Sequence, residues 1–189
     1  MADNLQAIEN EIDACDKCLS LLKPGMHNPR PGFPSTGSYD VVVIGAEPGW
    51  NATDRPDPVE YKGRFSPSDP GAHTRNTIQQ LFCCLEDAGL DFDRVFFTNS
   101  VKCAAERRKS PLCFRNCRPF LERQVRVIGP KLVVIIGRAA SNMGMPQVTT
   151  ESIERDTYLG YLALRIRHPR GASRMYRQRV ASTVAAIVG

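Results

Sequence analysis

Four short apolar runs along the chain predict buried β-strands. The first and third runs are nearly continuous in valine and isoleucine. This pattern is typical of strands covered on both faces, as in a parallel sheet. The four runs are Tyr39–Gly45, Arg94–Asn99, Lys131–Gly137 and Tyr161–Arg167.

Helical spacing of apolar residues appears between these runs and after the last one. Apolar positions recur at i, i+3, i+4 and i+7 over Ile78–Leu85, and a second stripe covers Cys117–Ile128. A third helix is predicted from about Ser173 to Val188. Strands that alternate with helices indicate a parallel sheet with helices on both faces. We therefore predict an α/β protein, a single-domain α/β/α sandwich over residues 1–189 with a central four-stranded parallel sheet.

The segments that follow the predicted strands carry polar groups suited to chemistry. In open α/β folds, ligands bind at the carboxyl ends of the strands. Those ends are Gly45–Gly49, Thr98–Ser100, Gly137–Arg138 and His168–Arg170. The segment Glu47–Gly71 is rich in Pro, Asp and Gly and has no periodicity, and a loop of that length is usually functional. The sequence therefore predicts a site at this edge of the sheet.

Composition narrows the class of protein. The chain has 189 residues, of which 42% are hydrophobic and 24% charged, as in globular proteins. It has no apolar run long enough for a transmembrane helix, and its acidic N-terminus does not resemble a signal peptide. We therefore expect a cytoplasmic protein with no membrane partner.

Positive charge is concentrated in two stretches. The net charge is only +5, but Lys102–Lys109 is basic and Arg165–Arg179 holds six arginines and one histidine. Such stripes are the electrostatic footprint of a polyanion such as DNA or RNA. An ordinary solvated surface gives the same pattern, so charge alone does not decide the partner.

The seven cysteines favour a metal or cluster site. Their number is odd and the chain is not a small secreted domain, so a disulfide framework is not expected. Cys15 and Cys18 form a C-x2-C pair, which suits a metal.

Six short motifs occur in one order along the chain. They are CDKC (Cys15–Cys18), GAEPG (Gly45–Gly49), KGRF (Lys62–Phe65), TNSVKC (Thr98–Cys103), NCRPFLERQ (Asn116–Gln124) and HPR (His168–Arg170). Together they resemble the uracil-DNA glycosylase superfamily, and most closely its family-four, iron-sulfur branch. Each motif alone is a weak signal, whereas all six in order are specific.

The resemblance implies a [4Fe-4S] cluster with a structural role. Its ligands would be Cys15, Cys18, Cys103 and Cys117, since four thiolates are the usual ligand set of such a cluster. Zinc in the same thiolates is one alternative, and ordinary core cysteines are another. The resemblance assigns no role to Cys113.

The resemblance also implies a base pocket. A glycosylase takes its base out of the helical stack and reads the edge of that base. Phe65 would stack on uracil, and Asn99 would read its edge, because an amide donates and accepts in one plane. His168 would stabilise negative charge on uracil O2. Other residues expected to bind substrate are Gly45, Ala46, Pro48 and Gly49, and those expected to bind DNA are Arg170 and Arg174.

The first loop departs from the family-four pattern. That pattern is GEAPG, with a carboxylate second, whereas here Ala46 is second and Glu47 is third. Family-one enzymes carry GQDPY, with their catalytic Asp third. Three interpretations of Glu47 therefore stay open. It activates water or stabilises the sugar cation, or it is misplaced and the enzyme is slow, or the site has become a binder or acquired another base specificity.

The predicted function is that of a monofunctional enzyme that hydrolyses uracil from DNA and so initiates base excision repair. Its partner would be uracil-containing DNA, bound by a monomer that is nucleoid-associated in a prokaryotic cytoplasm. One alternative is a catalytically impaired protein that binds uracil or abasic DNA. Another is a glycosylase for a different deaminated base, hypoxanthine or xanthine.

Overall fold

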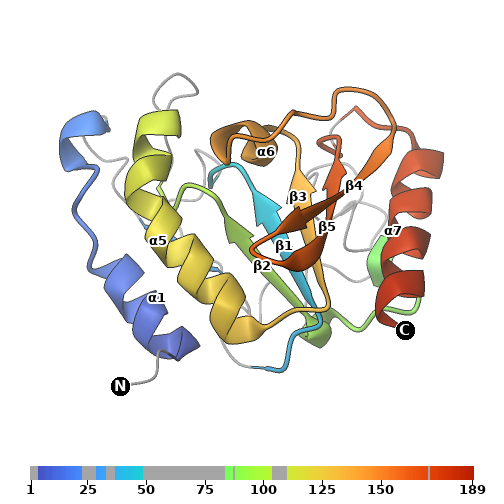
Figure 1. The fold of residues 1–189 in the computed structure, drawn as a ribbon, viewed down its shortest axis with the longest axis horizontal. Coiled ribbons are helices and arrows are strands. Elements are labelled where there is room, and N and C mark those ends of the chain that lie inside the picture. The colour runs from blue at the N-terminus through green and yellow to red at the C-terminus, as the bar shows by residue number, and fades with distance from the viewer. Residues whose placement is uncertain are drawn as a thin grey trace, which may run out of the picture.

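Five strands form one sheet in the computed structural model (Figure 1), which describes residues 4–22, 29–32, 37–48, 84–86, 88–103, 110–169 and 171–189. The strand order is β2-β1-β3-β5-β4. The first four of these pair in parallel, and β4 runs antiparallel to β5. The strands are β1 (Val41–Gly45), β2 (Val95–Asn99), β3 (Leu132–Ile136), β4 (Ile153–Tyr158) and β5 (Tyr161–Ile166).

The predicted α/β class and the four parallel strands are confirmed, but the count of four strands is wrong. The additional strand β4 is the outermost strand beside β5, and none of its residues is fully buried. Its sequence, IERDTY, therefore has no apolar run that would reveal it. A two-residue turn, Leu159-Gly160, joins β4 to β5 with both φ angles positive, at 55° and 88°. Positive φ at both positions is typical of the tight turns that join antiparallel strands.

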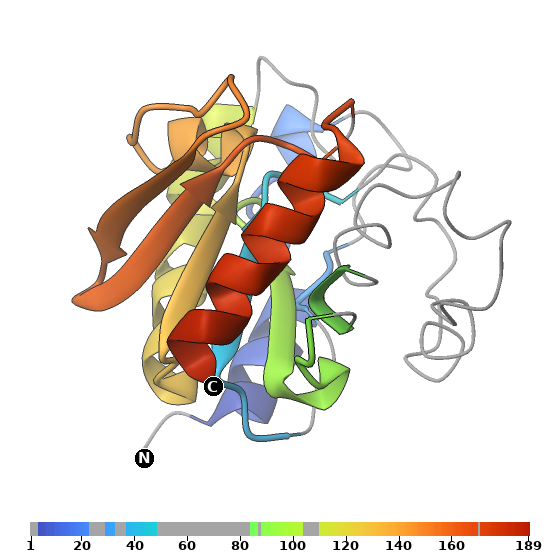
Figure 2. The same cartoon turned by 90° about the vertical axis from the view of Figure 1, so that its right-hand side faces the viewer.

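Helices cover both faces of the sheet (Figure 2). Helix α7 lies against one face, and α5 lies on the other with α1 beside it. The helix predicted from about Ser173 to Val188 is confirmed as α7. Ser173 caps the start of this helix by accepting a hydrogen bond from the Tyr176 amide. None of the helices within the described ranges is long and apolar enough to cross a membrane. The helices are α1 (Leu5–Asp13), α5 (Ser110–Ile128), α6 (Arg138–Asn142) and α7 (Arg174–Val188), and the 3-10 turns are η1 (Leu19–Leu21) and η2 (Phe92–Arg94).

The alternation of side chains along β1 explains the two layers. Val41 and Val43 belong to the core that includes α7, whereas Val42 and Ile44 belong to the core that includes α5. Successive side chains of a strand point to opposite faces. The continuous apolar run of β1 therefore contributes side chains to both cores, as its sequence predicted.

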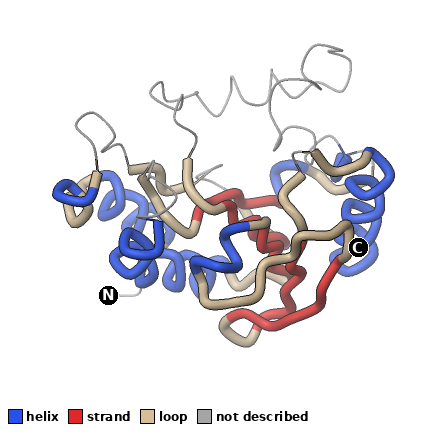
Figure 3. Tube along the Cα trace, turned by 90° about the horizontal axis from the view of Figure 1, so that it is seen from above, coloured by secondary structure: helices blue, strands red, loops and turns tan. Residues whose placement is uncertain are grey.

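The carboxyl ends of β1, β2, β3 and β5 lie along one edge of the sheet, at the top of Figure 1, and Figure 3 looks down on this edge. These strands are parallel and adjacent, so the segments that follow them must meet there. Helices α5, α6 and α7 also begin at this edge, at Ser110, Arg138 and Arg174. The fold therefore concentrates loops and helix starts where the sequence predicted a site.

Candidate functional site

Polar residues form a row along this edge. In the order of the strands, the row holds Asn99 at the end of β2, Glu47 after β1, Arg138 after β3 and His168 after β5. The sequence alone predicts that these ends converge, and the central two members of the row, Glu47 and Arg138, contact each other.

Asn99 lies directly over Gly45. The two residues are register partners on neighbouring parallel strands. A Cβ atom added at Gly45 would lie 2.5 Å from Asn99 Oδ1. Only glycine therefore leaves room for the Asn99 amide in this position, and the amide is mostly buried, at 8% exposed.

Glu47 is held from two sides. One carboxylate oxygen forms an ion pair with the Arg138 guanidinium, and the other accepts a hydrogen bond from Ser110 Oγ at 3.3 Å. The Glu47 side chain is 15% exposed and that of Arg138 is 27% exposed. The carboxylate is thus fixed at the edge but not sealed from solvent.

The loop after β1 is tied to the loop after β2. The Ala46 carbonyl accepts from the Val101 amide at 2.9 Å and from Ser100 Oγ at 2.8 Å. The Ser100 amide donates to the Gly45 carbonyl at 2.8 Å, and Pro48 is buried. These bonds fix the backbone that presents Glu47.

His168 is exposed at the end of β5, next to Gly137. Gly137 has a φ of 52°, and a Cβ atom there would lie 2.9 Å from His168 Cβ. The backbone before His168 is anchored by Tyr176, whose hydroxyl accepts from the Arg167 amide at 2.9 Å and donates to the Ser152 carbonyl at 2.8 Å. No sequence motif indicates this anchor, because its partners are separated along the chain.

Three predicted site residues lie outside the described residues: Gly49, Phe65 and Arg170. Arg174 is described and is exposed at the first position of α7. The roles assigned to these four residues therefore stay predictions.

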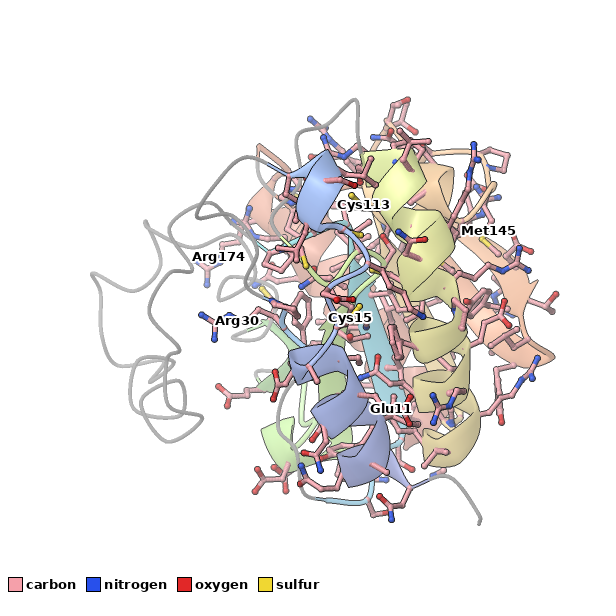
Figure 4. All side chains as sticks on the ribbon, turned by 90° about the vertical axis from the view of Figure 1, so that its left-hand side faces the viewer. Glu11, Cys15, Arg30, Cys113, Met145 and Arg174 are labelled. Atoms are coloured by element: carbon pink, nitrogen blue, oxygen red, sulfur yellow. The ribbon has the colours of Figure 1, made fainter. Side chains whose placement is uncertain are left out.

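Four cysteines gather where the segment after α1 meets α5, since Cys103 interacts electrostatically with Cys15, Cys18 and Cys117. Cys15, which is labelled in Figure 4, is half-buried, and the other three are buried. Two N–H groups point at their sulfur atoms: the Lys102 amide lies 3.4 Å from Cys117 Sγ, and Asn116 Nδ2 lies 3.5 Å from Cys18 Sγ. Burial and neighbouring thiols raise the pKa of Cys103 to about 12, a cost that a bound cationic centre would offset.

Four thiols are the ligand number of both a [4Fe-4S] cluster and a structural zinc ion. Within the described ranges, no three His, Cys, Asp or Glu side chains are arranged to bind one metal ion. Cys113 is buried one helical turn before Cys117 and interacts electrostatically with Cys103, so a fifth thiol lies nearby.

Lys102 does not belong to a surface stripe, contrary to the prediction from charge. It is 2% exposed, and its Nζ donates to Thr98 Oγ1 and Gln124 Oε1, both at 2.6 Å. Both partners in turn donate to the Pro31 carbonyl, at 2.7 and 2.8 Å. Burial lowers the pKa of Lys102 to about 7, with Cys117 and Glu9 opposing that shift. The lysine therefore braces the backbone beside Asn99 and is not positioned to meet DNA.

The arginine-rich stretch Arg165–Arg179 is also partly committed to internal contacts. Arg165 pairs with Asp156 at 2.8 Å. Arg177 donates to the Ala172 carbonyl and Arg179 to the Glu151 carbonyl. Only part of this positive charge is therefore available to a partner.

Comparison with known proteins identifies the family. The family model of the uracil DNA glycosylase superfamily matches residues 31–188. The Type-4 uracil-DNA glycosylase of Sulfurisphaera tokodaii is 29% identical over 138 residues, which are 72% of this chain and 56% of that protein. The protein of the same name from Saccharolobus solfataricus is 28% identical over 142 residues, 74% of this chain and 58% of that protein. The chain thus spans a little over half the length of these relatives. Because the family model covers most of the chain, including every described residue of the polar row, the chain belongs to the uracil-DNA glycosylase superfamily.

Proposed function

We propose that this chain is a monofunctional uracil-DNA glycosylase that hydrolyses the bond between uracil and deoxyribose in DNA and so initiates base excision repair. The observation that carries the proposal is the convergence of Asn99, Glu47 and His168 at one sheet edge in a member of this superfamily. The names of both relatives, Type-4 uracil-DNA glycosylase, support the same activity.

Asn99 would read the base. Its amide can donate to uracil O4 and accept from N3–H in one plane. The absence of a side chain at Gly45 supports this role, because it leaves room for the Asn99 amide at the end of β1. Phe65 would stack on the flipped base, as the resemblance to family four implies. Gly45, Ala46, Pro48 and Gly49 would form the backbone wall of the pocket.

Glu47 and His168 would act on opposite ends of the breaking bond. As the bond from C1′ to N1 breaks, its electron pair stays on uracil and positive charge builds on the sugar. His168 would donate a hydrogen bond to uracil O2 and stabilise the leaving anion. Glu47 would offset the sugar charge and orient the water whose oxygen bonds to C1′, while the proton released by that water passes to solvent.

Cys15, Cys18, Cys103 and Cys117 would hold a [4Fe-4S] cluster. Support comes from the burial of three of these thiols and from the N–H groups aimed at two of them. The role of the cluster would be structural, since it would join the segment after α1 to the start of α5. Arg170 and Arg174 would bind DNA phosphates beside His168.

A binding protein for uracil or abasic DNA is a second candidate, favoured by Ala46 at the position where family four carries a carboxylate. A single-turnover assay on an oligonucleotide with one uracil separates the two. An abasic product supports the enzyme, and tight binding without product supports the binder. Matched oligonucleotides with hypoxanthine, xanthine and thymine test the base range.

A further inference from the structure

The carboxylate of Glu47 forms an ion pair with an arginine that belongs to none of the six sequence motifs. Arg138 follows β3, 91 positions after Glu47 in the chain, and its Nη2 forms the ion pair described above. Burial lowers the pKa of Arg138, but an arginine stays protonated in proteins. A partly buried cation needs an anion beside it, and Glu47 supplies that anion.

The route of the backbone explains why Arg138 reaches Glu47. Gly137 adopts a φ of 52°, and a Cβ atom built at this residue would lie 2.9 Å from His168 Cβ. A residue with a side chain would be strained in this conformation and would strike His168. In the order of the strands, Arg138 therefore lies between Glu47 and His168, the two residues proposed to act on the bond.

A second interaction fixes the other oxygen of Glu47. Asn142 Nδ2 donates to Ser110 Oγ at 3.0 Å and to Ser100 Oγ at 2.9 Å. The Ser110 hydroxyl has two acceptors for its one proton, Glu47 Oε2 and Asn142 Oδ1, each at 3.3 Å. Ser100 Oγ in turn donates to the Ala46 carbonyl. The ring of bonds closes on the backbone next to Glu47, so both the side chain and the backbone are held.

We propose that Arg138 is a positioning residue that keeps the Glu47 carboxylate ionised and aimed at the sugar, with Ser110 and Asn142 holding its second oxygen. This proposal rests on the proposed function of Glu47. The groups that face this carboxylate in the described part of the chain are Arg138 from α6 and Ser110 from α5, with His168 behind Gly137. Arg138 therefore acts through Glu47 and needs no contact with the base.

A double-mutant cycle tests this coupling. Single-turnover uracil excision is measured for wild type, Arg138→Gln, Glu47→Gln and the double variant. We expect Arg138→Gln to slow excision by about 10-fold to 10²-fold in the wild-type background, because the carboxylate loses its orientation. In the Glu47→Gln background, the same change should cost little, since nothing remains to be positioned. Arg138→Lys, which keeps the charge, should recover part of the rate.

Equal reductions of the rate in both backgrounds would overturn the proposal, because they would mean that Arg138 acts on folding or on DNA independently of Glu47. A weaker DNA affinity with a shallower salt dependence in Arg138→Gln would equally overturn it and would make Arg138 a phosphate ligand.

A measurement that does not depend on uracil excision tests the pairing of Arg138 with Glu47 separately from the proposed function. With ¹³C-labelled glutamate, the Glu47 carboxyl resonance is assigned by its absence in Glu47→Gln and followed through a pH titration. We expect its midpoint to move to higher pH in Arg138→Gln, because a neighbouring cation favours the ionised form. If wild type excises no uracil but this midpoint moves, the proposed function fails and the pairing stands. An unmoved midpoint refutes the pairing whatever the activity.

Discussion

Asn99 and Gly45 are paired across two parallel strands so closely that the Asn99 side chain occupies the space where a side chain at residue 45 would begin. Asn99 Oδ1 lies 2.5 Å from the notional Cβ of Gly45, and Phe97 Cζ lies 3.1 Å from it. Both residues are the last of their strands. The amide proposed to read the base is thus placed by the absence of a neighbouring side chain.

Gly45→Ala should therefore displace the Asn99 amide. We expect single-turnover uracil excision to fall on the order of 10²-fold, because small misplacements of a positioning group have effects of that size. Binding to undamaged DNA should persist, since phosphate contacts do not involve the amide.

A matched control separates this effect from general destabilisation. Val41→Ala lies at the other end of β1 and should lower stability by weakening core packing without reaching Asn99. If Val41→Ala and Gly45→Ala reduce excision equally at equal thermal stability, Asn99 is not displaced as we infer.

The cysteine site predicts a brown protein when the chain is purified without oxygen. Iron and sulfide analysis should give four of each per chain, as a [4Fe-4S] cluster requires. Cys18→Ser should abolish or strongly reduce the iron content, because Cys18 is buried among the other thiols. Finding zinc, or no metal, in fresh protein contradicts the cluster.

Two further cysteines serve as controls for the ligand set. Cys84 is buried in the core that includes α7, on the other face of the sheet, so Cys84→Ser should leave the iron content unchanged. Cys113→Ser should also retain the colour if the four motif cysteines are the ligands. Loss of iron in Cys113→Ser would mean that the fifth thiol is a ligand.

The salt dependence of DNA binding tests the exposed arginines. Replacing Arg170 and Arg174 by alanine should make the plot of log affinity against log salt shallower, by about 0.9 for each phosphate that the variant no longer neutralises. Arg126→Ala is a suitable control, because Arg126 is exposed near the end of α5, at the opposite edge of the sheet. A slope that changes equally in the control would mean that this end of α7 does not face DNA.

The sequence predicted the parts of the fold that repeat a local pattern. The valine and isoleucine runs of β1 and β3 are buried on both faces and are therefore continuous in apolar residues. Strand β4 is half-exposed, and α6 has only five residues, so neither has a pattern long enough to be seen. Helix α5 begins at Ser110, before the predicted stripe at Cys117, and Cys113 and Phe114 in these additional turns are also buried.

The site was predictable as a set of strand ends but not as a set of contacts. Parallel strands bring their ends together, which is why Asn99, Glu47 and His168 could be expected at one edge. The pairing of Glu47 with Arg138 and the burial of Lys102 depend on tertiary packing over long separations. A lysine in a basic stretch normally lies at the surface, so only the packing around Lys102 reveals its structural role.

The role of Glu47 is the point at which this chain departs most from its family-four relatives. Its carboxylate is fixed by Arg138 and Ser110, and it remains 15% exposed at the edge beside Asn99. Glu47→Gln keeps the shape of the side chain and removes its charge. Ala46→Glu moves a carboxylate to the position usual in family four.

The most direct measurement is single-turnover excision of uracil from an oligonucleotide by wild type, Glu47→Gln and Ala46→Glu, with binding to the same DNA measured in parallel. Wild type should release uracil and leave an abasic site. Glu47→Gln should be slower by about 10²–10⁴-fold while binding persists, because only the charged form assists the reaction. Wild-type excision that is unchanged in Glu47→Gln and greatly accelerated in Ala46→Glu would contradict a catalytic Glu47, and no excision of uracil by wild type would contradict the proposed enzyme itself.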